Sequence, residues 1–148
     1  MPSTWKTPSL VPDLAYDDVA RAIDWLCRAY GFRERTDARL AWRGGMRAWL
    51  ELGDALVGLA SPGHGTESPQ KLGGVCHTLK LYVPDVDAHF AHAKAAGAEI
   101  TTEPMDGFWG GRIYRTRDLE GHLWEFSQAG VDLAAADWKP PPGTTRGA

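Results

Sequence analysis

The chain has 148 residues, of which 43% are hydrophobic and 24% charged, and its formal net charge is −3. This length and apolar content suit one compact domain with a buried core. The mild acidic balance argues against a nucleic-acid partner. No apolar run approaches the roughly 20 residues of a membrane span, and the first residues lack the pattern of a secretion signal. We therefore expect a cytoplasmic protein with no nucleic-acid and no membrane partner.

The cysteines and tryptophans add two expectations. Cys27 and Cys76 stand in neither a CxxC motif nor a zinc-type spacing, so both are expected to be small buried side chains in a reducing compartment. Seven tryptophans are many for a chain of this length. Some belong to the core, but large flat side chains are also the usual lining of a pocket for an aromatic ligand.

The first half of the chain predicts a strand, a helix and three further strands. Asp18 is a plausible N-cap, the apolar side chains after it recur at helical spacing, and Gly31 is suited to end the helix. Glycine-containing turns at 44–45 and 53–54 separate the later strands. The expected strands are 9–16, 32–41, 46–53 and 55–61.

The second half predicts the same order of elements. Residues 62–74 are rich in Gly, Pro and Ser and are expected to be a linker. Asp85 is a plausible N-cap for the second helix, which Gly97 ends. The tail 139–148 has too little apolar content to pack and is expected to be flexible. The expected strands are 75–83, 98–104, 111–117 and 122–128.

The two halves are related by an internal repeat. Asp18-Val19 matches Asp85-Val86, and the offset stays between 66 residues, from Gly31 to Gly97, and 68 residues, from Gly53 to Gly121. The chain is therefore predicted to contain two copies of one structural unit.

Two motifs, DDVARAIDWLCRAYGF (17–32) and RDLEGHLWEFSQ (117–128), resemble the vicinal oxygen chelate superfamily. That superfamily includes glyoxalase I, extradiol dioxygenases, fosfomycin-resistance enzymes and bleomycin-resistance proteins. The second motif is similar to the family ending Asp-Pro-x-Gly-His-x-Trp-x-apolar, with Leu119 in place of the usual proline. The resemblance covers residues 8–130.

The resemblance implies an α+β fold of two βαβββ modules, each with a curved mixed sheet around a cavity. The expected single domain spans 8–132, with module one at 8–62, the linker at 62–74 and module two at 75–130. The resemblance also implies that two chains pair as a homodimer and complete two cavities. Open sheet edges favour the same pairing.

Glu125 interrupts an apolar strand, and it falls at a position where enzymes of the superfamily carry a metal ligand. The other three ligand positions fall at Val11, at Thr78 and within 55–60, where no carboxylate, histidine or cysteine stands. A catalytic divalent site normally needs about three protein ligands. We therefore expect no metal and no cofactor.

The histidines do not change this expectation. Strand alternation places His77 with Leu79 and Leu81, so His77 is expected to pack under a helix, although a register shift of one residue would turn it toward the cavity. His89 and His92 are expected to be solvated helix residues, and His122 to be structural.

Without a metal, Glu125 is expected to form an ion pair or to meet a donor group of a ligand. Lys80, Arg112, Arg115 and Arg117 are the candidate partners. The flanking Trp124 and Phe126 point to the opposite face of the strand and are expected to be core residues.

The candidate ligand-binding side chains lie on the presumed cavity face or in a glycine-flanked loop beside it. Asp13 is an unusual acid in a core strand. The aromatic pair at 108–109 is flanked by glycines and has few apolar residues beside it in the sequence. The full set is Asp13, Trp42, Trp49, Thr78, Lys80, Tyr82, Phe108, Trp109, Arg112, Tyr114 and Glu125.

The function that these features favour is metal-free binding. The chain is expected to sequester an aromatic or antibiotic-like toxic compound at a homodimer interface, with no catalytic residue assigned. A metal-dependent glyoxalase-type isomerase, an epimerase or a ring-cleaving dioxygenase is the first alternative. The second is a metal-free enzyme that uses Glu125 as a base with Tyr114 or Tyr82 as an acid.

Overall fold

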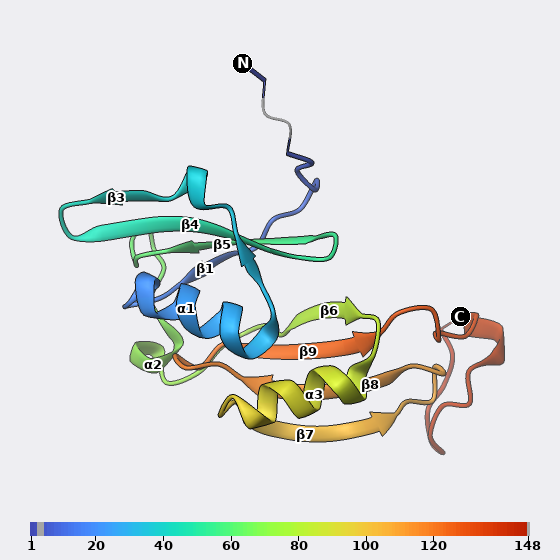
Figure 1. Cartoon of the computed structure of the whole chain (residues 1–148). Coiled ribbons are helices and arrows are strands. Elements are labelled where there is room, and N and C mark those ends of the chain that lie inside the picture. The colour runs from blue at the N-terminus through green and yellow to red at the C-terminus, as the bar shows by residue number, and fades with distance from the viewer. Residues whose placement is uncertain (3–4, 148) are drawn as a thin grey trace.

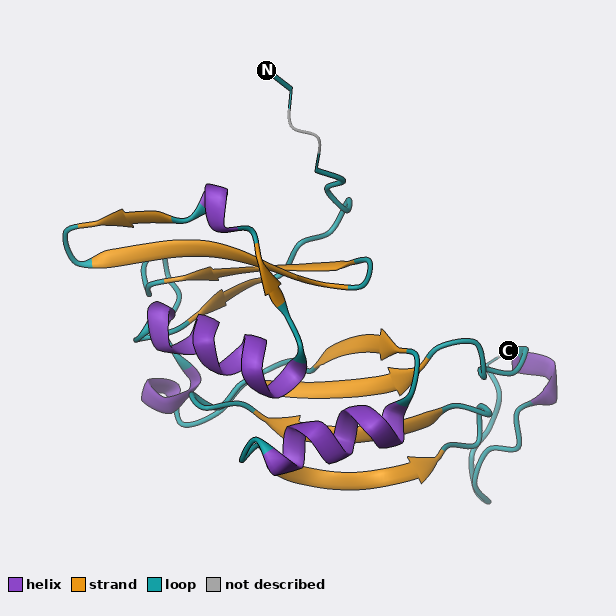
Figure 2. Ribbon diagram, viewed as in Figure 1, coloured by secondary structure: helices purple, strands orange, loops and turns teal. Residues whose placement is uncertain are grey.

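The structure is a computed structural model that describes residues 1–2 and 5–147. It contains two sheets, each with a long helix packed on one face (Figures 1 and 2). Module one consists of β1 (Asp13–Ala15), α1 (Val19–Tyr30), β2 (Arg33–Glu34), the short 3-10 helix η1 (Thr36–Ala38), β3 (Leu40–Trp42), β4 (Gly45–Leu52) and β5 (Ala55–Ala60).

Module two repeats this plan after a short helix. That helix, α2 (Pro69–Leu72), lies in the segment expected to be only a linker, and Ser68 caps its N-terminus. Module two consists of β6 (Leu79–Val83), α3 (Val86–Ala95), β7 (Glu99–Asp106), β8 (Arg112–Arg117) and β9 (Leu123–Gln128), followed by the 3-10 helix η2 (Ala135–Asp137).

Both sheets are mixed. Their strand orders are β1-β5-β4-β2, with β3 paired to β4, and β6-β9-β8-β7. The first and last strands of each module pair in parallel, and the other pairs are antiparallel. The α+β fold of two βαβββ modules is therefore confirmed. Among the described residues, no helix combines the length and apolar character that crossing a bilayer requires.

The two long helices begin and end as their sequences predict. The Asp18 carboxylate accepts a hydrogen bond from the backbone N–H of Arg21, and the Asp85 carboxylate accepts one from Ala88. Gly31 ends α1 with a φ of 80°, in the left-handed region that favours glycine. Capping side chains thus fix the start of both helices.

The strands differ from the sequence prediction at three places. Strand β1 begins at Asp13 rather than residue 9, because Pro12 has no N–H to contribute to a ladder. The strand expected over 32–41 is divided by η1. Strand β6 begins at Leu79, so Cys76, which was expected to be buried, is exposed ahead of it.

One hydrophobic core joins the two modules. The aromatic ring of Tyr30, the last residue of α1, packs edge-on against Trp124 and Phe126 of β9, with ring centroids 5.6 and 5.0 Å apart. All three residues are fully buried. As expected, Trp124 and Phe126 are core residues. The inner face of each sheet is the face toward this core, and the outer face is the opposite one.

The turn at 118–122 fastens module one to module two. The Asp118 carboxylate accepts hydrogen bonds from Tyr16 Oη at 2.6 Å and from Trp124 Nε1 at 3.0 Å. Glu120 accepts from the backbone N–H groups of Asp17 and Asp18, just ahead of α1. His122 Nε2 donates to the carbonyl of Ala15 at 2.8 Å, so its expected structural role is confirmed.

Candidate functional site

Glu125 lies in the middle of the outer face of the second sheet. Its neighbours across the strands are Lys80 of β6 and Arg115 of β8, and residues paired in this way share a face. The Glu125 side chain is 14% exposed, and its Oε2 lies 3.4 Å from Arg115 Nε. Of the four candidate partners, Arg115 is therefore the one that pairs with Glu125.

A cavity of about 300 Å³ opens beside Glu125. We call it the Glu125 cavity. Tyr82 Oη donates a hydrogen bond to Asp132 Oδ2 at 2.9 Å, and Lys80 Nζ lies 5.4 Å from the centre of the Tyr82 ring. Four of the seven lining side chains are aromatic. The lining residues are Lys80, Tyr82, Phe108, Trp109, Glu125, Asp132 and Trp138.

Trp109 owes its position to the glycines of its loop. A Cβ on Gly107 would lie 2.3 Å from the Trp109 ring, and a Cβ on Gly111 would lie 2.2 Å from its Nε1. Only glycine leaves room for the indole at both positions. Trp109 Nε1 is buried and has no hydrogen-bond partner among the described residues. A buried donor without a partner is uncommon in folded proteins.

Trp138, just before the tail, lines the Glu125 cavity, which the sequence did not indicate. The Trp138 ring packs edge-on against Phe108, with ring centroids 6.0 Å apart. Arg146 donates hydrogen bonds to the carbonyls of Ala135 and Trp138. The end of the chain was expected not to pack, but these contacts hold part of it beside the cavity.

Asp13 and Trp49 line a second cavity, on the outer face of the first sheet. Arg47 Nη2 donates to Asp13 Oδ1 at 2.7 Å, and the Arg47 guanidinium lies 4.7 Å from the centre of the Trp49 ring. The cavity has a volume of about 380 Å³, and we call it the Asp13 cavity. Its lining residues are Trp5, Thr7, Val11, Asp13, Arg35, Ala38, Arg47, Trp49 and Leu56.

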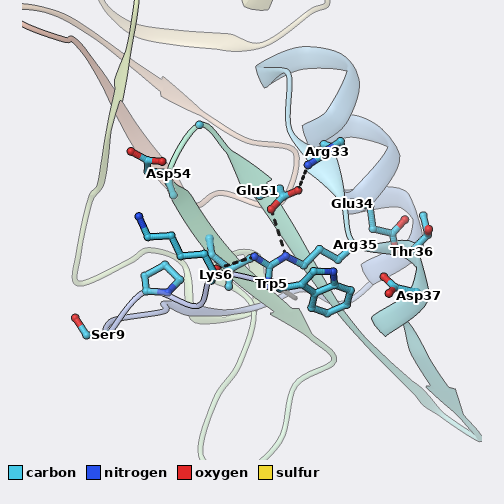
Figure 3. A pocket seen from close by; sticks show the side chains of 14 residues that line it. Trp5, Lys6, Ser9, Arg33, Glu34, Arg35, Thr36, Asp37, Glu51 and Asp54 are labelled. Atoms are coloured by element: carbon cyan, nitrogen blue, oxygen red, sulfur yellow. Dashed lines mark hydrogen bonds and ion pairs between the residues drawn. The ribbon is translucent and has the colours of Figure 1, made fainter. Parts of the chain in front are cut away.

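A third cavity, of about 590 Å³, lies between residues 5–9 and the edge of the first sheet (Figure 3). Its walls are mainly polar, and Glu51 forms ion pairs there with Arg33 and Arg35. None of the eleven candidate side chains lines it. Trp5 and Arg35 belong to this cavity and to the Asp13 cavity.

Arg112 and Tyr114 were expected on the same face as Glu125, and the structure shows that this is wrong. Tyr114 pairs with Phe126 across the strands and therefore faces inward. Its hydroxyl lies 2.6 Å from His89 Nδ1. Burial raises the pKa of Tyr114, so this residue is a poor candidate for a catalytic acid. Arg112 binds both carboxylate oxygens of Asp87, on α3, at 2.8 Å.

Two further candidates line neither the Glu125 cavity nor the Asp13 cavity. Trp42 is 55% exposed on β3, and its ring lies against Gly45, where a Cβ would be 2.6 Å away. Thr78 is exposed and precedes β6. The structure thus brings Lys80, Tyr82, Phe108, Trp109 and Glu125 together at one cavity and Asp13 with Trp49 at another.

Two histidines differ from their predicted surroundings. His77 is exposed rather than packed under a helix, because β6 begins two residues after it. His89 is partly buried rather than solvated, and its Nε2 lies 2.8 Å from the carbonyl oxygen of Tyr30. Burial lowers the pKa of His89. Its neutral ring therefore joins α1 to α3 as a structural contact.

The donor set around Glu125 does not fit a divalent metal. Its neighbours across the strands are two cations, Lys80 and Arg115. Across the described residues, no group of three or more His, Cys, Asp or Glu side chains is arranged to hold a metal ion.

Comparison with known proteins identifies relatives along most of the chain. A model of the Glyoxalase/Bleomycin resistance protein/Dioxygenase superfamily matches residues 10–126. An uncharacterized protein of Mycobacterium tuberculosis (strain H37Rv) is 35% identical over 131 residues, which cover 82% of this chain and 74% of that protein.

Solved structures show the same fold. TioX from Micromonospora sp. ML1 is 39% identical with a TM-score of 0.66, and the match covers 86% of this chain and 100% of TioX. The fosfomycin resistance protein FosX from Listeria monocytogenes is 15% identical with a TM-score of 0.62, over 86% of this chain and 97% of FosX. At 15% identity, the second similarity concerns the fold alone.

Proposed function

We propose that this chain, which belongs to the Glyoxalase/Bleomycin resistance protein/Dioxygenase superfamily, binds a planar, largely aromatic small molecule without changing it chemically. The observation that carries the proposal is the Glu125 cavity, in which four aromatic side chains surround one ammonium group and two carboxylates, those of Glu125 and Asp132. Aromatic pairs contribute roughly 0.5–1.5 kcal/mol each beyond the area that they bury. Several such contacts give useful affinity without any catalytic step.

The polar groups of the cavity suit a ligand that carries both donors and acceptors. Glu125 already has Arg115 as a partner, and Asp132 has Tyr82. Lys80 Nζ lies 5.7 Å from the centre of the Trp109 ring and forms a cation–π contact with it. Trp109 Nε1 adds a buried donor. A ring with an acceptor at its edge would pair with that donor while stacking on the aromatic wall.

The biological role that we propose is sequestration of an antibiotic-like toxic compound by the chain as a homodimer. The superfamily includes bleomycin resistance proteins by name, which supports the role. The fold supports a homodimer, because the outer faces of both sheets point away from the shared core. A second copy that placed its Asp13 cavity opposite the Glu125 cavity would enclose both. Light scattering that finds a monomer at micromolar concentration would contradict the dimer.

The experiment that tests ligand binding uses acridine, a planar aromatic ring system, as the probe. Calorimetric titration should detect saturable binding of acridine. Trp109→Ala should weaken acridine binding by roughly 1–3 kcal/mol, the loss typical of an aromatic anchor. Trp42→Ala is the matched control, because it removes an exposed tryptophan that lines neither cavity. Equal affinities of the wild type and Trp109→Ala would refute the proposal.

The enzyme alternatives are tested separately. Elemental analysis of protein purified without chelator should find far less than one divalent metal per chain, and one bound metal per chain would favour a metal-dependent enzyme. Glu125→Gln distinguishes binding from metal-free catalysis. We expect this variant to retain acridine binding, because the amide keeps the shape of the side chain. Turnover of a ligand that Glu125→Gln abolished would overturn the sequestration role.

A further inference from the structure

We propose that a cavity built by the last residues of the chain takes an uncharged alkyl substituent of the ring that binds in the Glu125 cavity. The inference rests on the proposed function and adds a ligand class to it: a planar aromatic ring with a flexible apolar chain at its edge. The cavity has a volume of about 370 Å³, and we call it the tail cavity. Seven of its eight lining residues lie between 135 and 147, so the end of the chain forms most of its wall.

The C-terminal segment, residues 129–147, lies outside the part of the chain that the family model matches. That match ends at residue 126, yet Asp132 and Trp138 both line the Glu125 cavity. Figure 1 shows the segment folded back beside the loop that joins β7 to β8. A ligand preference that this segment sets would therefore belong to this chain and would not follow from its family.

The loop between β7 and β8 is shaped to receive this segment. The backbone N–H of Leu133 donates to the carbonyl of Trp109 at 2.7 Å. The backbone N–H of Lys139 donates to the carbonyl of Phe108 at 3.3 Å. Gly110 has a φ of 86°, and a Cβ there would lie 2.4 Å from Leu133 Cγ. Glycine at this position thus provides both the backbone conformation and the space that Leu133 occupies.

The lining of the tail cavity favours an uncharged substituent. Ring and methyl side chains make up much of it: Phe108, Ala135, Trp138 and Pro140. Arg146 is the one ionisable residue of the lining, and its guanidinium donates to the carbonyls of Ala135 and Trp138 at 3.0 and 3.1 Å. No carboxylate lines the cavity, so a cationic substituent would lose hydration without gaining an ionic partner.

The tail cavity and the Glu125 cavity have two walls in common. Phe108 and Trp138 line both cavities. Their rings meet edge-on, and each residue is 40% exposed. A chain attached to a ring in the Glu125 cavity therefore passes only these two side chains, neither of which the core encloses. At about 300 Å³ the Glu125 cavity alone lies at the lower limit of small-molecule sites, and the added 370 Å³ brings the pair well within their range.

The test compares acridine with 9-methylacridine, 9-propylacridine and 9-hexylacridine by calorimetric titration. Each CH₂ group that becomes buried should raise the affinity roughly fourfold. We therefore expect 9-hexylacridine to bind at least roughly 30-fold more tightly than 9-methylacridine. In ¹H–¹⁵N spectra, the hexyl chain should shift the backbone N–H signals of Thr144, Thr145 and Gly147, which line the tail cavity. Acridine itself should leave these signals in place.

A matched pair of variants locates the alkyl chain. Ala135→Phe places a ring in the tail cavity, whereas Ala136→Phe places the same ring on the adjacent residue, which lines neither this cavity nor the Glu125 cavity. We expect Ala135→Phe to abolish the gain from the hexyl chain and to keep the affinity for acridine within about twofold of the wild type. Ala136→Phe should retain the whole gain.

The outcomes separate this inference from the proposed function. Equal affinities for acridine and 9-hexylacridine would overturn the tail cavity and leave the Glu125 cavity as a binding site. A hexyl gain that Ala135→Phe retained would place the chain elsewhere and would also overturn it. Tighter binding of 9-(5-carboxypentyl)acridine, whose chain of the same length ends in a carboxylate, would assign the cavity to an anion at Arg146 and overturn the ligand class. Failure of acridine itself to bind would refute the proposed function, and this inference with it.

Discussion

Asp118 is the residue whose loss should do most damage outside the apolar core. Its side chain accepts hydrogen bonds from Tyr16 Oη and Trp124 Nε1, and from the backbone N–H groups of Glu120, Gly121 and His122. Asp118 is 6% exposed, and both side-chain donors are fully buried. Asp118→Ala would leave these donors with no partner and no access to water.

The magnitude follows from the two side-chain donors. An unsatisfied buried donor costs about 1–3 kcal/mol, so Tyr16 and Trp124 together imply a loss of about 2–6 kcal/mol before the three backbone groups are considered. Domains of this size have free energies of unfolding of about 5–15 kcal/mol. We therefore expect Asp118→Ala to lose at least about 3 kcal/mol of stability. Tyr16→Phe removes one of the bonds and should lose about 1.5–3 kcal/mol, the value for a bond to a charged group.

Urea unfolding followed by circular dichroism measures both variants. Asp24→Ala is the control, because Asp24 is an exposed acid on α1, and surface substitutions usually stay within about 0.5 kcal/mol of the wild type. If Asp118→Ala does not fold, Tyr16→Phe still measures the contribution of the turn. A wild-type midpoint for Tyr16→Phe, or a loss well under about 3 kcal/mol for Asp118→Ala, would refute the role of this turn.

Two further predictions concern the core. Burial lowers the pKa of His89, so the folded protein binds fewer protons at this residue than the unfolded chain does. The free energy of unfolding should therefore be unaffected by His89 above the unfolded pKa of about 6.5. It should fall as the pH drops below that value. Urea titrations from neutral pH to pH about 5 should show a smaller fall for His89→Leu than for the wild type, and equal slopes would contradict the assignment. Trp124→Ala should cost about 3–5 kcal/mol through the cavity that it leaves, and a melting temperature close to that of the wild type would show that this site repacks.

The sequence was sufficient for the fold and for the two faces of β9. The repeat and the capping residues Asp18 and Asp85 located the modules and helices. The alternation of Trp124, Glu125 and Phe126 assigned the inner and outer faces correctly, because one polar residue stands between two large apolar ones. Strand patterns of this kind are informative when the two faces differ in polarity.

Strand β8 shows where the same reasoning failed. Strand β8 reads Arg-Ile-Tyr-Arg-Thr-Arg, so polar and apolar side chains occur on both of its faces. The polarity pattern therefore does not distinguish the inner face from the outer face. Only the register, in which Arg115 pairs with Glu125 and Tyr114 with Phe126, assigns them. Register depends on long-range pairing, which composition and spacing do not contain. In this register, Arg112 and Tyr114 face the helix side of the sheet rather than the outer face.

The aromatic residues near the two ends of the chain were missed for a different reason. Trp5 and Trp138 lie outside any periodic segment, so no local pattern connects them to a cavity. They reach the cavities because hydrogen bonds hold the neighbouring backbone. Arg35 donates to the carbonyl of Lys6, and Arg146 donates to the carbonyl of Trp138. The one available signal was the presence of tryptophan in an otherwise polar segment.

The contacts of the 118–122 turn have a consequence for synthesis of the chain. Tyr16 bonds to a residue 102 positions later, and the backbone of Ala15 to one 107 positions later. On the ribosome, the N-terminal part of a chain emerges first. The start of module one therefore lacks its hydrogen-bond partners until residues 118–122 have been synthesised. Closing such long loops is entropically costly and slow. Synthesis of residues 118–122, rather than completion of the first half, should therefore be required before module one reaches its native structure.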